Sequence, residues 1–245
     1  MTVRQRKAPP VTTETRRLIR SRRAALDNGE RDEYLRVNRL CRAAIRRDCV
    51  SHYTGRVKIQ ITVTQETSFI VLHSRNMTIT KRELHTSDDS VNVSITRLLL
   101  YPERDQVYLS VNESLQLGQN YTLSFEFNYT LREALEGFYL SHYTAANGSK
   151  RYLATTQFEP NAARAAFPCF DEPQLKATFQ LAMVRHESHT ALFNTPRRST
   201  ADLDFYLGAG IKQDDFFETV RMSTYLVAFI VSDYAHISDT TDGSE

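Results

Sequence analysis

Hydrophobic and polar residues alternate in several segments of the chain after residue 50. In 121–129, five apolar residues occupy one face and four polar residues the other, and 57–63 follows the same rule. This alternation is typical of a half-buried antiparallel strand. Turn-forming residues stand between most of the candidate strands. By these criteria, seven further strands are predicted: 68–73, 91–101, 106–111, 137–144, 151–157, 177–184 and 224–231.

Many short strands without long helices between them predict a mainly β fold, an antiparallel β-sandwich over residues 50–245. One short helix is predicted at 161–166, where alanine is frequent and Asn161 can cap the first turn. Periodicity thus assigns the larger part of the chain to one fold class.

The first 49 residues follow a different period. Apolar residues recur there every three or four positions, as on one face of a helix: Tyr34, Val37, Cys41, Ala44 and Ile45. A turn signal at 27–29 separates two predicted helices, 14–26 and 30–47. We therefore predict a short basic helical leader, residues 1–49, whose first 13 residues are disordered.

Charge divides the chain at the same place. Residues 1–49 hold 14 of the 31 Lys and Arg and 6 of the 29 Asp and Glu, so the leader carries +8 and the remainder −6. A basic arm can bind nucleic acid or anionic lipid. Tyr34 is the leader's one aromatic residue for stacking on bases, which disfavours nucleic acid as a partner. A solvated helical hairpin is the simpler interpretation.

The composition resembles that of a globular domain, with 41% hydrophobic and 24% charged residues. Three cysteines exclude a disulfide-rich scaffold. The longest apolar run, 225–231, has seven residues, whereas a membrane-spanning helix needs about 20. The basic N-terminus is not followed by the apolar stretch of a signal peptide. The sequence therefore predicts neither a membrane span nor a signal peptide.

Six Asn-x-Ser/Thr sequons lie on the predicted sheet region: Asn76, Asn92, Asn112, Asn120, Asn128 and Asn147. With 10 Asn and 43 Ser and Thr in 245 residues, chance gives about 1.8 sequons. The excess favours N-glycosylation and a history in the secretory pathway or on a cell surface. Frequent Ser, Thr and Asn on exposed strand faces are the alternative explanation.

The segment from His186 to His189 comes close to a zinc motif. A zinc-binding H-E-x-x-H helix places both imidazoles on one face, but here the second histidine comes one residue early. The segment also follows a predicted strand and has the composition of a turn. We therefore predict no metal site there.

The segment 151–179 contains a predicted strand, a polar turn, a short helix and then the sequence Phe-Pro-Cys-Phe-Asp-Glu-Pro. Gln157 and Glu159 are two residues apart at the end of the strand, so their side chains can point to the same side. An amide carbonyl beside a carboxylate offers acceptor oxygens that suit an ammonium group. From these two residues alone, an ordinary polar turn is the simpler interpretation.

This segment resembles the signature of the zinc aminopeptidase family that includes aminopeptidase N, glutamyl aminopeptidase and the endoplasmic-reticulum aminopeptidases. The resemblance covers roughly residues 50–245. Five other segments are also similar to the N-terminal domain of that family: 55–59, 67–73, 137–139, 190–194 and 222–229.

The resemblance implies a saddle-like β-sandwich that contacts a catalytic domain and completes its substrate pocket. It also implies that Gln157 and Glu159 bind the free amino terminus of a peptide, while Glu172 is expected to hold its loop in shape. Zinc is implied for the full-length family, but no cofactor is expected in this chain. The family suggests the cell surface, the extracellular space or the lumen of the endoplasmic reticulum.

The chain ends before the positions where the family carries H-E-x-x-H and G-x-M-E-N. We therefore expect a fragment, inactive alone, of a metalloaminopeptidase that removes N-terminal residues from peptides. One alternative is a truncated, non-catalytic relative that binds peptides or acts as a decoy. Another is an adaptor whose basic leader binds nucleic acid or membrane. A reading frame that continues into both motifs would separate the first interpretation from the second.

Overall fold

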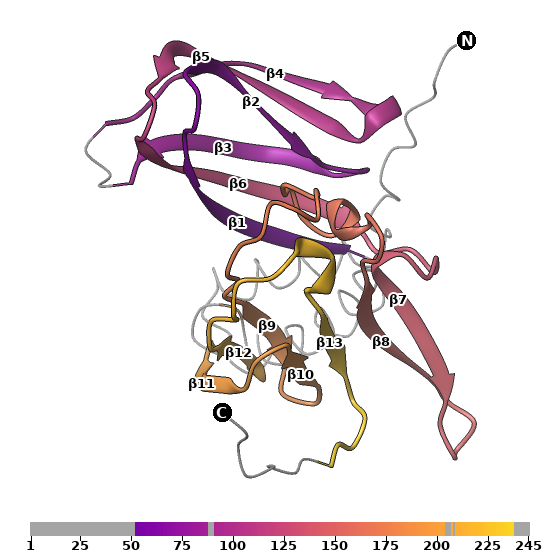
Figure 1. Ribbon diagram of the computed structural model, residues 1–245. Helices are drawn as coiled ribbons and strands as arrows, with labels where there is room; N and C mark the ends of the chain where they lie inside the picture. Colours follow the sequence, from indigo (N-terminus) through magenta and orange to yellow (C-terminus); the bar gives the residue numbers. More distant parts are fainter. Residues whose placement is uncertain (1–51, 88–90, 204–206, 208, 238–245) are drawn as a thin grey trace, which may run out of the picture. The chain divides into compact units, whose positions relative to one another are not determined.

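The computed structural model describes residues 52–87, 91–203, 207 and 209–237. The basic leader, with the two helices predicted in it, lies outside the described residues. The described residues from Thr54 onward form one compact unit. The eight strand pairings whose register the structure describes are all antiparallel. The mainly β, antiparallel architecture predicted from the sequence is therefore confirmed (Figure 1).

Residues 52–130 form two three-stranded sheets, which we call the first sandwich. One sheet has the order β1–β6–β3 and the other β2–β5–β4. A single 3-10 turn, Pro102–Arg104, follows β4. The strands are β1 (His52–Thr62), β2 (Thr67–His73), β3 (Thr78–Thr86), β4 (Ile95–Tyr101), β5 (Gln106–Leu115) and β6 (Asn120–Thr130).

The core of the first sandwich is formed by the inward-facing residues of both sheets. Leu72, Leu84 and Leu109 come from three different strands and are fully buried. In β6, each residue of the apolar set is buried while the polar residues between them are partly or fully exposed. Burial of a leucine or phenylalanine side chain contributes about 1.5–3 kcal/mol, so the alternation supplies most of the stability of this region.

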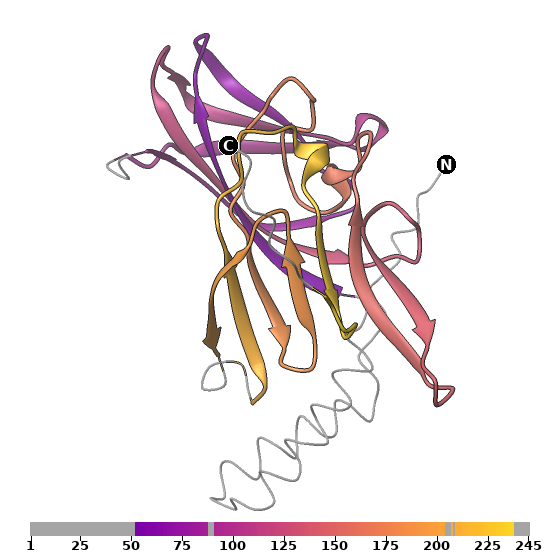
Figure 2. The same ribbon diagram turned by 60° about the horizontal axis from the view of Figure 1, so that its bottom comes forward.

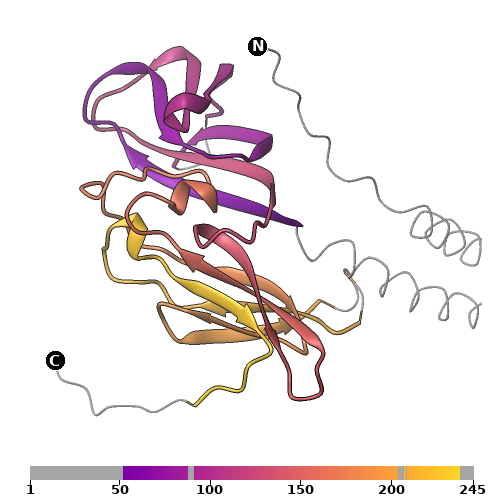
Figure 3. The ribbon, with the colours of Figure 1, turned by 90° about the vertical axis from the view of Figure 1, so that its right-hand side faces the viewer.

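Residues 137–232 form two more sheets, which we call the second group. Their orders are β10–β13–β8–β7 and β11–β12–β9. In Figures 2 and 3, the β7–β8 hairpin extends beyond the shorter strands around it. The strands are β7 (Gly137–Thr144), β8 (Lys150–Gln157), β9 (Ala182–His186), β10 (Thr190–Phe193), β11 (Arg197–Asp202), β12 (Ile211–Phe216) and β13 (Phe229–Ser232).

Several elements differ from their predicted form in the second group. The helix expected at 161–166 is a single 3-10 turn, Ala163–Ala165. The strand expected at 177–184 is reduced to β9. Before it, residues 177–181 keep backbone hydrogen bonds to 216–222, such as that from the Thr219 amide to the Phe179 carbonyl at 2.9 Å, and the Thr219 hydroxyl also accepts from the Phe179 amide at 3.0 Å. The pairing of 177–181 is therefore limited to an isolated antiparallel bridge, between Ala177 and Met222, and does not form a continuous strand.

The strand expected at 224–231 begins as a 3-10 turn, Thr224–Leu226, and becomes β13 only at Phe229. The Ser223 hydroxyl donates to the Pro173 carbonyl at 2.7 Å, and the Thr224 hydroxyl donates to the Phe170 carbonyl at 2.9 Å. These two hydrogen bonds tie the turn to the segment after β8. Among the described residues, no helix has the length and apolar character needed to cross a membrane.

Candidate functional site

Gln157 and Glu159 lie where β8 ends. Gln157 is the last residue of the strand, pairs with Gly137 of β7 and has an exposed side chain. Phe158 then turns inward and is only 2% exposed, while Glu159 is exposed again. Two side chains with acceptor oxygens therefore flank a buried ring. No hydrogen bond or ion pair of either side chain is formed within the described part of the chain.

The ring of Phe158 fixes this turn to its surroundings. Its centroid lies 5.9 Å from that of Phe167 and 6.0 Å from that of Phe229, both edge-on, a favoured arrangement of aromatic pairs. Gly137 has a φ of 71°, and a side chain there would meet the Cβ of Ala165 at 2.8 Å. Close packing of this kind gives the turn a rigid base.

The segment 158–175, which we call the site segment, is held by a buried ion pair. The Arg164 Nε donates to the Asp171 Oδ2 at 2.8 Å, and the Arg164 amide donates to the same oxygen at 3.3 Å. The Asp171 side chain is fully buried. The carbonyl of Arg164 also accepts the amide of Arg75 at 2.8 Å. Arg164 is thus fixed through its backbone and its side chain.

The site segment is joined to β2 through His73. Two backbone hydrogen bonds, of 2.8 and 3.0 Å, connect His73 with Cys169. Burial lowers the pKa of the His73 imidazole, and the Arg164 charge lowers it further. Burial also raises the pKa of the Cys169 thiol well above its usual value. Both groups are therefore kept neutral beside the site segment near pH 7.

Glu172 lies next to His73. Its Oε2 is 3.7 Å from the His73 Nδ1, and its side chain is 42% exposed. This oxygen has no hydrogen-bond partner among the described residues, so the loop-holding role expected from the sequence stays a prediction. The contacts among His73, Arg164, Asp171 and Glu172 could not be inferred from the sequence, because His73 is nearly a hundred residues from the other three.

The six sequon asparagines are all exposed. Asn128 lies on the outward face of β6, and Asn147 lies in the turn between β7 and β8. The Asn147 Oδ1 accepts hydrogen bonds from the Ser149 amide at 3.0 Å and from the Ser149 hydroxyl at 2.6 Å. The amide nitrogen that would carry a glycan therefore stands in an ordered, exposed turn.

His186 is the last residue of β9, and the three residues after it form the turn to β10, in agreement with the turn predicted for this segment. The Ser188 hydroxyl lies between the two rings, 2.7 Å from the His186 Nδ1 and 3.1 Å from the His189 Nδ1. Within the described ranges, no three His, Cys, Asp or Glu side chains are grouped so that they could hold a metal ion. These residues do not fit a zinc site.

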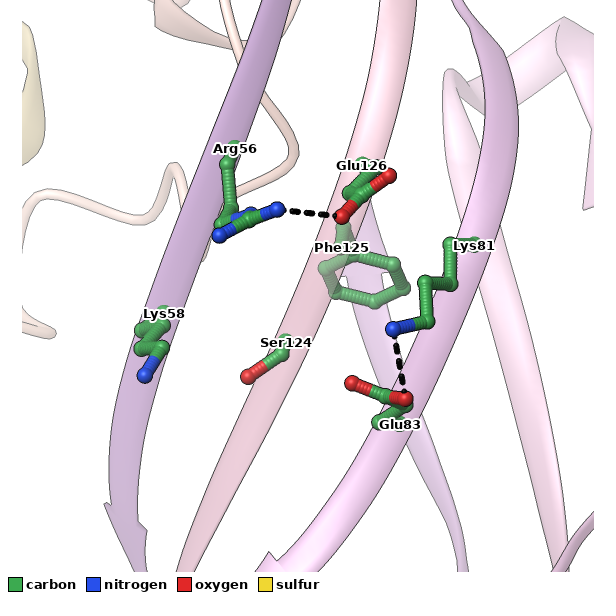
Figure 4. A pocket seen from close by; sticks show the side chains of 7 residues that line it. All are labelled: Arg56, Lys58, Lys81, Glu83, Ser124, Phe125 and Glu126. Carbon is green, nitrogen blue, oxygen red and sulfur yellow. Dashed lines mark hydrogen bonds and ion pairs between the residues drawn. The ribbon is translucent and has the colours of Figure 1, made fainter.

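A shallow pocket of about 170 Å³ lies on the sheet of β1, β6 and β3 (Figure 4). Its walls carry two exposed ion pairs, Arg56–Glu126 at 2.7 Å and Lys81–Glu83 at 2.8 Å. The hydrogen bond between Lys81 and Glu83 raises the pKa of the lysine and lowers that of the glutamate. Because these charges neutralise each other in solvent, the pocket has weak ligand-binding chemistry. It includes neither Gln157 nor Glu159.

The chain matches a known protein family over most of its length. The model described as the peptidase M1 N-terminal domain matches residues 35–226. The chain belongs to this family. The aminopeptidase resemblance drawn from the segments around Gln157 is thereby confirmed.

The M1 domain is similar to a part of several curated aminopeptidases. It is 41% identical to human endoplasmic reticulum aminopeptidase 2 over 187 residues, which cover 75% of this chain and 19% of that protein. It is 40% identical to rat endoplasmic reticulum aminopeptidase 1 over 190 residues, 77% of this chain and 20% of that protein. Human aminopeptidase Q is 36% identical over 201 residues, 79% of this chain and 20% of that protein. The chain thus spans about a fifth of the length of these relatives.

Proposed function

We propose that this M1 domain completes the substrate pocket of a zinc aminopeptidase and that Gln157 and Glu159 hold the free amino group of the peptide. The observation that carries the proposal is the exposed pair of acceptor side chains on either side of the buried Phe158. An ammonium group needs several acceptor oxygens, and a carboxylate with an amide carbonyl supplies them. The names of the relatives, which are aminopeptidases, support the same chemistry.

The proposed binding depends on a partner domain. An exposed carboxylate attracts an ammonium ion by less than about 1 kcal/mol in water. The same hydrogen bonds strengthen when a second protein surface excludes the solvent. In the family, the partner is the catalytic domain, and its zinc activates the attacking water. The M1 domain alone is therefore expected to bind peptide amino termini weakly and not to cleave them.

Exposed apolar residues support the docking of such a partner. Large apolar side chains are exposed in the segments between strands and on strand β10 of the second group, and Val220 is 80% exposed. Domain interfaces within one chain bury about 600–1,500 Å², and exposed apolar patches often mark such surfaces. The residues concerned include Leu175, Leu192, Phe217, Val220 and Leu226.

The secretory pathway is the proposed compartment. Two of the relatives are named as endoplasmic reticulum aminopeptidases. Six exposed sequon asparagines are compatible with glycans on the folded domain. We therefore propose that the protein is a glycoprotein of the secretory pathway.

The amine-binding role can be tested in a chimaera that carries this domain in front of the remaining part of human endoplasmic reticulum aminopeptidase 2. Glu159→Ala should lower kcat/KM for aminoacyl substrates about 10- to 100-fold, the cost of losing a hydrogen bond to a charged group. Glu103→Ala, which removes another exposed carboxylate, is the matched control. An unchanged kcat/KM in the Glu159→Ala chimaera, with an unchanged melting temperature, would contradict the assignment.

A further inference from the structure

The Nδ1 of His73 and the Oε2 of Glu172 face each other, and neither atom carries a proton when the imidazole is neutral. His73 is 7% exposed, and its Nδ1 accepts a long hydrogen bond of 3.5 Å from the Asp171 amide. The Glu172 Oε2 lies 3.7 Å from the same nitrogen. A neutral Nδ1 that accepts a hydrogen bond has no proton to offer a carboxylate. Two acceptors are therefore adjacent, at a distance beyond that of a hydrogen bond.

Two oxygens of this cluster are buried and have no hydrogen-bond partner among the described residues. They are the Glu172 Oε2 and the Asp171 Oδ1. A buried polar atom without a partner costs about 1–3 kcal/mol and is rare in folded proteins. One added proton would relieve this cost at Glu172, because a protonated imidazole donates from both ring nitrogens.

We propose that His73 and Glu172 form a proton-dependent switch that changes the position of the site segment and thereby regulates the amine-binding pair Gln157 and Glu159. The effect on amine binding rests on the proposed function. The movement of the site segment does not, since it is a property of the isolated chain. In the neutral state, His73 accepts from the Asp171 amide. In the protonated state, it donates to Glu172 and releases that amide.

The contacts of Asp171 give the switch a path to the site. Asp171 holds the amide and the side chain of Arg164, and Arg164 belongs to the 3-10 turn that follows Glu159 by only a few residues. The Ala162 amide donates to the Phe158 carbonyl at 2.7 Å. A shift of the Asp171 backbone is therefore transmitted through bonded neighbours to the residues on both sides of Phe158.

The charges around His73 set the pH range. Arg164 opposes protonation from the site segment, while Asp171 and Glu172 from the same segment and Asp105 after the 3-10 turn of Pro102–Arg104 favour it. Burial is the largest influence, and the net effect is a pKa below the ordinary value of 6.5. The imidazole is thus neutral near pH 7 and takes up its proton below pH 6.5.

The switch can be tested by amide and imidazole NMR of the whole chain between pH 7.5 and 5. The His73 ring and the amides of the site segment should titrate together below pH 6.5. His73→Asn keeps an acceptor for the Asp171 amide but cannot take up a proton, so it should abolish the response. Glu172→Gln presents an amide donor that competes with the Asp171 amide for the Nδ1 lone pair. The His73 ring then stays neutral at neutral pH, but the amides of the site segment should move there toward their acid-state positions. His142→Asn, a change on the exposed face of β7, is the matched control and should keep the response.

Amides 157–172 that stay unchanged over this pH range, or that change equally in His73→Asn, would overturn the proposal. If His73→Asn does not fold, the neutral-pH spectrum of Glu172→Gln decides, because a spectrum equal to that of the wild type refutes the switch. The readout needs neither peptide nor catalysis. A failure of the switch is therefore distinguishable from a failure of amine binding, which the Glu159→Ala chimaera measures.

Discussion

The first sandwich and the second group are held together in different ways. In the first sandwich, β1 and β6 alternate regularly, and twelve buried residues form one cluster in the core. In the second group, the strands are shorter. Hydroxyl side chains connect the segments between them, and buried ion pairs lie within the site segment and between β9 and β12. The comparison indicates that the regular region supplies the stability, while the irregular region positions the candidate site.

Asp214 illustrates the second mode of stabilisation. Its carboxylate is completely buried in β12 and accepts hydrogen bonds from Arg185 of β9 and Thr200 of β11. Burial opposes ionisation of Asp214, but the hydrogen bonds from Arg185 and Thr200 outweigh it and lower its pKa. One charged group thus joins all three strands of its sheet, where the first sandwich uses apolar side chains.

The largest change in the free energy of unfolding is expected when a buried phenylalanine of the first sandwich is replaced, and an exposed phenylalanine of the second group is its control. Phe125 of β6 is 1% exposed, and its replacement by Ala should lower the free energy of unfolding by about 4 kcal/mol through loss of burial and a cavity. Phe217, at the end of β12, is half exposed, and Phe217→Ala should change it by less than about 0.5 kcal/mol. Urea denaturation followed by circular dichroism measures both. Equal losses would show that Phe217 belongs to a folding core.

The second largest loss of stability is expected when the buried carboxylate of Asp214 is replaced. Asp214→Asn leaves Arg185 buried without its anion and should cost about 3 kcal/mol. The matched change Glu126→Gln in the first sandwich, at an exposed ion pair with Arg56, should cost less than about 1 kcal/mol. Hydrogen exchange should increase in β9, β11 and β12 of Asp214→Asn and remain unchanged in β1–β6. Faster exchange throughout both regions would contradict this separation.

The same variant gives a pH test. Because the folded-state pKa of Asp214 is depressed, the ionised carboxylate stabilises the protein above its ordinary pKa of 3.8, and this contribution is lost as the pH falls through the folded-state pKa. The wild type should therefore lose more stability between pH 6 and 3 than Asp214→Asn. Parallel stability curves for the two proteins would show that another group controls acid unfolding.

The smallest expected effect is at the tip of the β7–β8 hairpin. Asn147→Gln removes a sequon but no buried contact, so the free energy of unfolding should change by less than about 0.5 kcal/mol. When the chain is secreted from animal cells, the variant should lose one glycan on a gel and after glycosidase treatment. A wild-type protein without glycans would refute glycosylation, and the compartment proposed from it would lose that support.

The sequence predicted the first sandwich better than the second group. Strict alternation located β6 to within one residue at each end, because each buried residue lies on the same face. It missed β3, where a register shift between Ile79 and Lys81 breaks the alternation. A β-bulge adds one residue to a strand and moves the following side chains to the other face. Strands β11 and β12 were missed because charged and polar residues predominate in them.

For the candidate site, the sequence located Gln157 and Glu159 through family resemblance but not the contacts beneath them. Arg164 and Asp171 are seven residues apart in an irregular segment, where no period relates their side chains. His73 reaches the same cluster from β2. Such contacts depend on the tertiary path of the chain, which a local pattern of residues does not encode. The amine-binding role of Gln157 and Glu159 remains a prediction.

The burial of Cys169 has a practical consequence. Its thiol lies in the centre of the site segment and is 4% exposed, so a thiol reagent reaches it only when that segment opens. With Cys41 and Cys49 replaced by Ser, the rate of labelling at Cys169 would report the free energy of local opening. The native Cys169 thiol thus reports local opening beneath the candidate site, and no cysteine has to be introduced for the measurement.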